Sequence, residues 1–161
     1  MLAETGTDFF PWSKSYETGH RNMDREHLQL VSMLNGLVRS IDGQQELETQ
    51  RELLSRLIAD AQQHFRHEEQ WMDASEFPGA AEHKEIHQQL EQEMTDYAAA
   101  FNRGAPAGIR GETGGNCSEM LGFLKAWFAN HLIGVDNHTG RWLASYDRQP
   151  KSPQPLELST K

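Results

Sequence analysis

The sequence predicts an all-α protein, an up-down-up-down antiparallel four-helix bundle with an N-terminal arm. In four separate stretches, apolar residues recur at steps of three and four, which is the spacing of one helix face. No stretch shows the alternating pattern of a strand. The length of 161 residues suits one domain with a single core. Short connections between most of the stretches favour antiparallel neighbours.

The helices are expected over about residues 21–42, 46–74, 79–102 and 117–145. Gly43 follows the first helix and Pro78-Gly79 follows the second, and both are helix-ending signals. Residues 103–116 contain five glycines, which predicts a loop longer than bundles usually use. The expected organisation is therefore an arm over residues 1–20, a bundle over 21–145 and a polar, Pro-containing tail or linker over 146–161.

Composition excludes several classes of partner. The chain has 15 Lys and Arg against 24 Asp and Glu, a formal net charge of −9. That balance argues against nucleic acid or an anionic membrane as a partner. Cys117 is the only cysteine, so an internal disulfide is excluded and a reducing compartment is expected. With no signal-peptide pattern and no apolar run near the roughly 18 residues of a membrane span, we expect a cytoplasmic location.

Histidines and carboxylates occur in spaced pairs. His64 and Glu68 are four residues apart, and so are His83 and His87. Residues four apart lie on the same face of a helix, so each pair could grip one metal ion, or two adjacent ions. A single such pair is weak evidence, because a solvated histidine-rich helix face produces one as well.

Position along the bundle axis indicates which residues of different helices lie close together. In an antiparallel hairpin, residues equally far from the turn lie at one level. Around a turn near Phe77, Glu68 lies nine residues before and His83 six after, which agrees to within one helical turn of roughly 5 Å. The same comparison at the other two connections aligns His27 and His131. The residues expected at one level are His27, His64, Glu68, His83, His87, His131 and Asp136.

This set of side chains predicts a metal centre. Burying five imidazoles and two carboxylates without partners would cost several kcal/mol for each charged group. Seven ligands are too many for one tetrahedral zinc ion. Mixed imidazole and carboxylate ligands suit iron, and carboxylates can bridge two ions. A zinc-loaded or metal-free bundle is the alternative.

The chain resembles the bacterial hemerythrins over residues about 12–143. The matching segments are Trp12-Ser13, Met23-Asp24-Arg25-Glu26-His27, His64-Phe65-Arg66-His67-Glu68-Glu69, His83 with His87, and Trp127 through His131 to Asp136. The resemblance implies two non-haem Fe ions joined by an oxo or hydroxo bridge. It implies that His83, His87 and His131 hold one iron, that His27 and His64 hold the other with one position open, and that Glu68 and Asp136 bridge them.

The function implied by the resemblance is reversible binding of molecular oxygen, for storage, delivery or sensing. A downstream signalling domain or an oxygen-consuming enzyme would be a further partner. The alternative is a di-iron enzyme that reduces oxygen, peroxide or nitric oxide. Binding without catalysis is favoured, because the sequence offers no evident acid–base group beyond the ligands. A phosphotransfer bundle would need one exposed histidine rather than five inward ones.

The last predicted helix poses a geometric problem. His131 and Asp136 are five residues apart, so a straight α-helix would separate them by about 140°. Either the aspartate reaches around the helix, or the helix widens locally to i→i+5 bonding. Gly134 would ease such a widening. The resemblance also suggests that Gly134 leaves a looser wall beside the oxygen site, although helix geometry alone could explain this glycine.

The remaining conspicuous residues have ordinary interpretations. His20, His67 and His138 are expected to be surface or rim histidines. Trp12 fits an arm that packs on the bundle. Asp24 fits a helix cap or a first-turn acid, with a supporting role near the metal as the alternative.

Overall fold

The computed structural model describes residues 8–103 and 114–149, and within them every regular element is helical. A 3-10 turn, η1 (Lys14–Tyr16), precedes α1 (Arg21–Asp42), α2 (Leu47–Ala74) and α3 (Ala80–Arg103). The fourth rod is continuous in sequence and consists of α4 (Gly114–Trp127), the π-helical segment η2 (Phe128–Val135) and α5 (Asp136–Asp147). The predicted all-α class is confirmed. Most of the glycine-rich connection, and the predicted tail from residue 150 on, lie outside the described residues.

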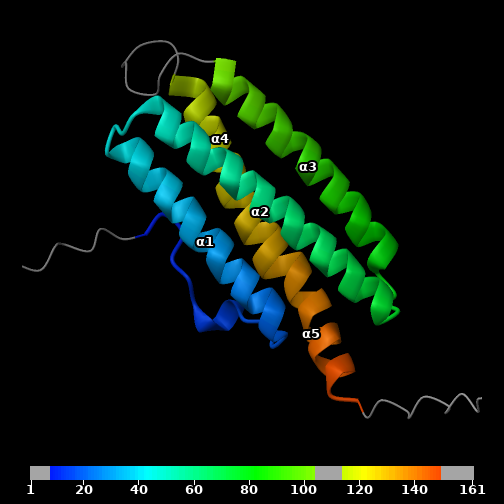
Figure 1. Cartoon of the computed structure of the whole chain (residues 1–161). Coiled ribbons are helices and arrows are strands. Elements are labelled where there is room, and N and C mark those ends of the chain that lie inside the picture. Colours follow the sequence, from blue (N-terminus) through cyan, green and yellow to red (C-terminus); the bar gives the residue numbers. More distant parts are fainter. Residues whose placement is uncertain (1–7, 104–113, 150–161) are drawn as a thin grey trace, which may run out of the picture.

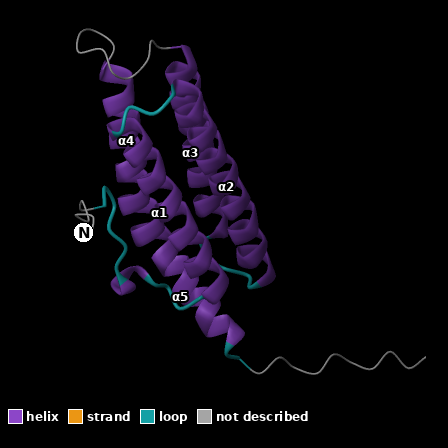
Figure 2. Ribbon diagram, turned by 60° about the vertical axis from the view of Figure 1, so that its left-hand side comes forward, coloured by secondary structure: helices purple, strands orange, loops and turns teal. Residues whose placement is uncertain are grey.

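Each helix packs against the next in the chain, so that α1 contacts α2, α2 contacts α3, and α3 contacts α4. Figures 1 and 2 show the four rods lying side by side as a bundle. The apolar stripes meet along the bundle axis, where Leu34, Leu57 and Phe128 have no exposed surface. None of the helices in residues 8–103 and 114–149 is both long and apolar enough to cross a membrane.

Two tight turns join the first three helices. After α1 the Gln45 N–H donates to Ser40 O, and after α2 the Phe77 N–H donates to Met72 O, both over five residues. Each turn places a non-glycine residue in the left-handed region, Gln44 at φ 52° and Glu76 at φ 51°. These are Schellman-type helix ends. Gly43 therefore ends α1 as expected, but the left-handed position falls one residue later.

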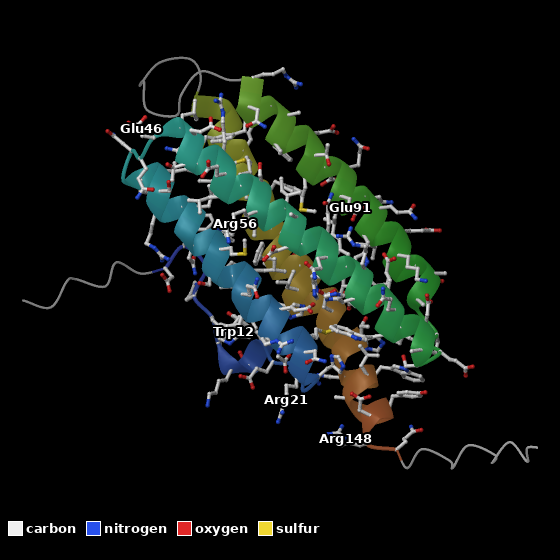
Figure 3. All side chains as sticks on the ribbon, in the orientation of Figure 1. Trp12, Arg21, Glu46, Arg56, Glu91 and Arg148 are labelled. Carbon is white, nitrogen blue, oxygen red and sulfur yellow. The ribbon has the colours of Figure 1, made fainter. Side chains whose placement is uncertain are left out.

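The segment before α1 is attached to the bundle at two points. The Phe10 N–H donates to the Asn35 side chain, whose amide donates back to Phe10 O, at 2.8 and 2.9 Å. Asp24 accepts hydrogen bonds from the backbone N–H groups of Thr18 and Gly19 and from the Thr18 hydroxyl. Trp12 packs against the same core from this segment, beside α1 in Figure 3.

Two interpretations of the region around the start of α1 change. Asp24 is the first-turn acid of α1, which was one of the two expectations, and not its cap; it also accepts the hydrogen bonds that hold the preceding segment. The cap is His20, whose Nδ1 accepts from Met23 N–H at 3.4 Å. His20 is buried against Trp71, with ring centroids 4.7 Å apart, so the expectation of a surface or rim histidine was wrong. His138 is exposed and His67 is partly exposed at the rim, as expected.

Candidate metal centre

The structure brings together all seven residues that the sequence singles out. They come from all four rods and meet in the bundle interior. Each is at most 3% exposed. They are His27 of α1, His64 and Glu68 of α2, His83 and His87 of α3, His131 of η2 and Asp136 of α5.

Five of the seven form the larger ligand group, Glu68, His83, His87, His131 and Asp136, with one nitrogen or oxygen atom from each lying within 4.8 Å of the others. Asp136 Oδ1 lies 3.1 Å from His83 Nε2 and 3.0 Å from His131 Nε2. Glu68 Oε2 lies 3.3 Å from His87 Nε2. Three imidazoles and two carboxylates thus face one small volume.

The second ligand group is His27, His64 and again Asp136. Asp136 Oδ2 lies 3.2 Å from His27 Nε2 and 3.4 Å from His64 Nε2. Glu68 Oε2 lies 3.8 Å from His64 Nε2, so the glutamate also stands between the groups. The two oxygens of Asp136 therefore face different histidine groups, which is the geometry of a bridging carboxylate.

The π-helical segment puts Asp136 in this position. The Asp136 N–H donates to His131 O, a bond between residues five apart. The helix thus widens between the two residues, and the aspartate does not have to reach around a regular turn. Of the two possibilities left open by the sequence, the structure has the rarer one, a π segment at a functional site.

Three outer histidine nitrogens have partners that sequence reasoning missed. Nδ1 of His64 lies 2.9 Å from Glu26 Oε2, and Nδ1 of His87 lies 2.9 Å from Glu69 Oε1. Glu26 directly precedes His27 and Glu69 directly follows Glu68 in the sequence. This position next to a predicted ligand was the signal that could have found them. Partners of this kind fix which ring nitrogen faces the metal.

The third outer partner is a hydroxyl. Nδ1 of His83 lies 2.9 Å from Thr139 Oγ1, on the turn after Asp136, and Thr139 is 1% exposed. Glu26 has a second histidine contact as well, because its Oε1 lies 2.8 Å from Nδ1 of His67 at the rim. Glu26 thus contacts both the buried ring of His64 and the partly exposed ring of His67.

The charges at the centre are strongly perturbed. Burial and the nearby Asp136 charge raise the pKa of Glu68. Burial opposes ionisation of Asp136 too, but the charge of His131 and hydrogen bonds from the histidines hold its pKa well below the usual range. Against the effect of burial, hydrogen bonds to Asp136 and Glu26 raise the pKa of His64 to about 10. These shifts of pKa favour positive charge beside Asp136, which is what a bound metal ion would also supply.

Several ligand atoms lack hydrogen-bond partners in the described part of the chain. Both carboxylate oxygens of Glu68 are buried and unpaired. Nε2 of His87 is unpaired too, since its 3.3 Å approach to Glu68 lacks hydrogen-bond geometry. Buried polar atoms without partners are costly, and a bound cation would satisfy all of these at once. The donor set therefore fits a metal ion.

Comparison with known proteins agrees with this geometry. A family model described as the hemerythrin HHE cation binding domain matches residues 18–143, which is most of the chain. The chain belongs to the hemerythrin family. Its relatives include a bacteriohemerythrin of Pseudomonas aeruginosa, 26% identical over 125 residues, which are 78% of this chain and 75% of the relative.

Hemerythrin relatives from other organisms match to a similar degree. A bacteriohemerythrin of Stenotrophomonas maltophilia is 24% identical over the same shares of the two chains. A myohemerythrin of Riftia pachyptila is 24% identical over 127 residues, covering 79% of this chain and 88% of that protein. The family match begins at Thr18, so it includes Thr18 and Gly19, whose amides Asp24 holds, but not Phe10.

Of the interpretations of Gly134 in this hemerythrin-family chain, the looser wall was wrong, whereas helix geometry fits its place inside the π segment. Gly134 is exposed, and a Cβ added to it would meet no atom within 4 Å. A side chain there would extend into solvent, so its absence does not loosen any wall of the centre. The apolar surroundings come from Phe65, which stacks on His87 at 4.2 Å, and from Trp127, which meets the Phe65 ring edge at 5.9 Å.

Proposed function

We propose that the centre holds two iron ions per chain and binds molecular oxygen reversibly, for storage, delivery or sensing. One observation carries the proposal: the two oxygens of Asp136 face separate histidine groups, one of three imidazoles and one of two. Relatives named bacteriohemerythrin and myohemerythrin support it. The proposal includes the up-down-up-down antiparallel order and the N-terminal arm, which the packing of each helix on the next supports.

In this proposal the seven residues have unequal tasks. His83, His87 and His131 would hold one iron, His27 and His64 would hold the other, and Glu68 and Asp136 would be shared between the two. The second ion would have fewer protein ligands, so it is the one that would take a small molecule. Bound iron would supply the reversible one-electron steps that oxygen binding needs.

Residues other than the seven ligands orient the imidazole rings and exclude water. Glu26, Glu69 and Thr139 orient three imidazole rings by holding their outer nitrogens. Phe65 is 1% exposed and stacks on His87, so it keeps water from this side of the centre and protects a bound ligand from protons. These contacts prepare the geometry before any ligand arrives.

Oxygen binding is favoured over catalysis because the carboxylates around the centre are already hydrogen-bonded to ligand histidines. Among the described residues, Glu26 and Glu69 are the carboxylates bound to the cluster from outside, and each is already engaged by a ligand's outer nitrogen. A reductase would need an acid group free to deliver protons to the substrate. Catalytic reduction of oxygen, peroxide or nitric oxide remains the second candidate for experiment.

The test is iron analysis with optical spectra of the full chain loaded with Fe(II) under argon. We expect two irons per chain, an absorption band that appears in air, and its disappearance on return to argon. Glu68→Ala should lose iron, whereas Glu85→Ala, at an exposed position of α3, should retain two. One iron per chain would refute the two-iron centre. A band that never reverses, with continuous oxygen consumption under a reductant, would favour the enzyme.

A further inference from the structure

An apolar cavity of about 440 Å³ lies at one end of the bundle, between the α2–α3 turn and α5. Figure 1 shows that turn and α5 at the same end of the molecule. Phe77, His138 and Trp142 contribute aromatic rings to its lining. The Phe77 ring lies 5.9 Å from the His138 ring and 5.8 Å from the Trp142 ring. We call this space the aromatic cavity.

The backbone fixes the wall that Phe77 provides. The left-handed Glu76 and the bond from Phe77 N–H to Met72 O set the direction of the turn. The ring then lies so close to Gly79 that an added Cβ would stand 2.9 Å from Phe77 Cε1. Phe77 is only 8% exposed, whereas Trp142, on the other side, is 39% exposed. A large apolar side chain thus borders an unfilled space.

The deepest lining residues are His83 and Thr139, which are 3% and 1% exposed. Their polar atoms are already joined to each other at 2.9 Å, so they offer an occupant little hydrogen bonding. Binding in the cavity would therefore depend on apolar contact and shape. The deepest part of the cavity is lined by His83, a proposed metal ligand.

Volume and charge define the occupant. A space of about 440 Å³ lies within the roughly 300–1,000 Å³ typical of small-molecule sites. Glu82 at the rim and the net charge of −9 oppose an anion. The floor opposes a cation, because His83 would carry part of a metal's positive charge. A neutral ring compound would bury apolar area against this lining and could pack on its aromatic rings.

We propose that the aromatic cavity binds a small neutral molecule of one or two aromatic rings. The apolar contact does not depend on the proposed function, but the exclusion of a cation rests on the metal of the proposed centre. A bound molecule would contact Thr139, whose hydroxyl is hydrogen-bonded to His83, and could in this way affect the metals. This coupling to the metals rests on the proposed two-iron centre. The site would thus let an apolar compound adjust the outer ligation of the three-histidine iron.

The experiment is calorimetric titration of the iron-loaded full chain with three probes that share one ring system. Indole is neutral, indole-3-acetate is an anion and tryptamine is a cation. We expect indole to bind one per chain and the two charged probes to bind at least tenfold more weakly. Equal binding of all three would overturn the assignment of a neutral ligand.

Variants locate the binding. Trp142→Ala removes a wall, and Ile86→Phe places a larger side chain in the lining; each should weaken indole binding at least tenfold while iron content and helicity are retained. Leu28→Ala is the matched control, because Leu28 is a 49% exposed apolar residue of α1. Wild-type indole binding in both cavity variants, or an equal loss in the control, would overturn the site.

Two further measurements distinguish a ligand site from a dimer interface and test the coupling to iron. Sedimentation that shows a dimer in the wild type but not in Trp142→Ala would mean that a second copy covers the cavity, which would overturn the proposal. The absorption spectrum of the iron-loaded protein should shift when indole saturates the site. Binding without any shift would overturn the coupling through His83 and would leave both the site and the proposed oxygen function standing.

Discussion

The Oδ1 atom of Asp136 lies 3.0 Å from the Nε2 atom of His131, although the two residues are five positions apart on one helical rod. The bond from Asp136 N–H to His131 O spans the same five residues. The widened turn therefore puts these two residues on one face of the rod, as a regular turn does for residues four apart. The turn contains one residue more than a regular turn would need to bring the two side chains together.

Deletion of Gly134 should retain iron. Gly134 is exposed and its Cβ position meets nothing, so its loss removes no contact. The shortened turn can close with i→i+4 bonds and still present the histidine and the aspartate on one face. Deletion of Glu85 is the control, because it leaves His83 and His87 three apart on a regular helix and rotates one by about 100°. Iron analysis should show two irons in the first variant and fewer in the second.

Glu26→Gln and Glu69→Gln should each weaken iron binding about 10- to 100-fold, as loss of such outer partners typically does. Each change keeps the shape but removes the charge beside an outer nitrogen, of His64 and His87 respectively. Competition with a chelator measures the effect. Glu85→Gln should leave the affinity unchanged. An equal, small effect in all three variants would show that the two contacts are incidental.

The metal-free chain should lose stability as the pH rises from about 6.5 to about 10. The folded-state pKa of His64 is raised from 6.5 to about 10, so its protonated form contributes stability that is complete below 6.5. That contribution disappears as pH passes through the folded-state value. Urea denaturation at pH 6.5, 8 and 10 measures the slope, and Glu26→Gln should reduce it. A flat profile in the wild type would contradict the prediction.

Gly140→Ala should destabilise the protein by about 1–3 kcal/mol, the usual cost of overpacking. A Cβ there would overlap Thr18 and would stand 2.7 Å from Met23 Sδ. Adding Thr18→Gly should recover part of the loss, because it removes the side chain that is struck. Gly36→Ala is the control, since nothing lies within 4 Å of that position. Chemical denaturation of the four proteins compares the changes.

What the sequence could predict follows from how local each signal is. Spacings such as His83 to His87 are set within one helix, so their faces could be predicted without the fold. The contact of Glu26 with His64 joins two helices through particular side-chain rotamers, which no spacing encodes. The looser wall suggested for Gly134 could not be checked from spacing, because the π segment changes the direction in which the residues after His131 face. His20 was misjudged because a single residue at a helix start has no periodicity.

The two-point attachment of residues 10–19 to α1 has a consequence for how the protein opens. The amide hydrogens of Phe10, Thr18 and Gly19 are held by the side chains of Asn35 and Asp24 rather than by neighbours in their own segment. Exposing those amides to solvent requires breaking contacts with α1, and Asn35 is buried within it. Slow hydrogen–deuterium exchange should therefore extend beyond the helices into this irregular segment, which opens in one cooperative step with the first helix.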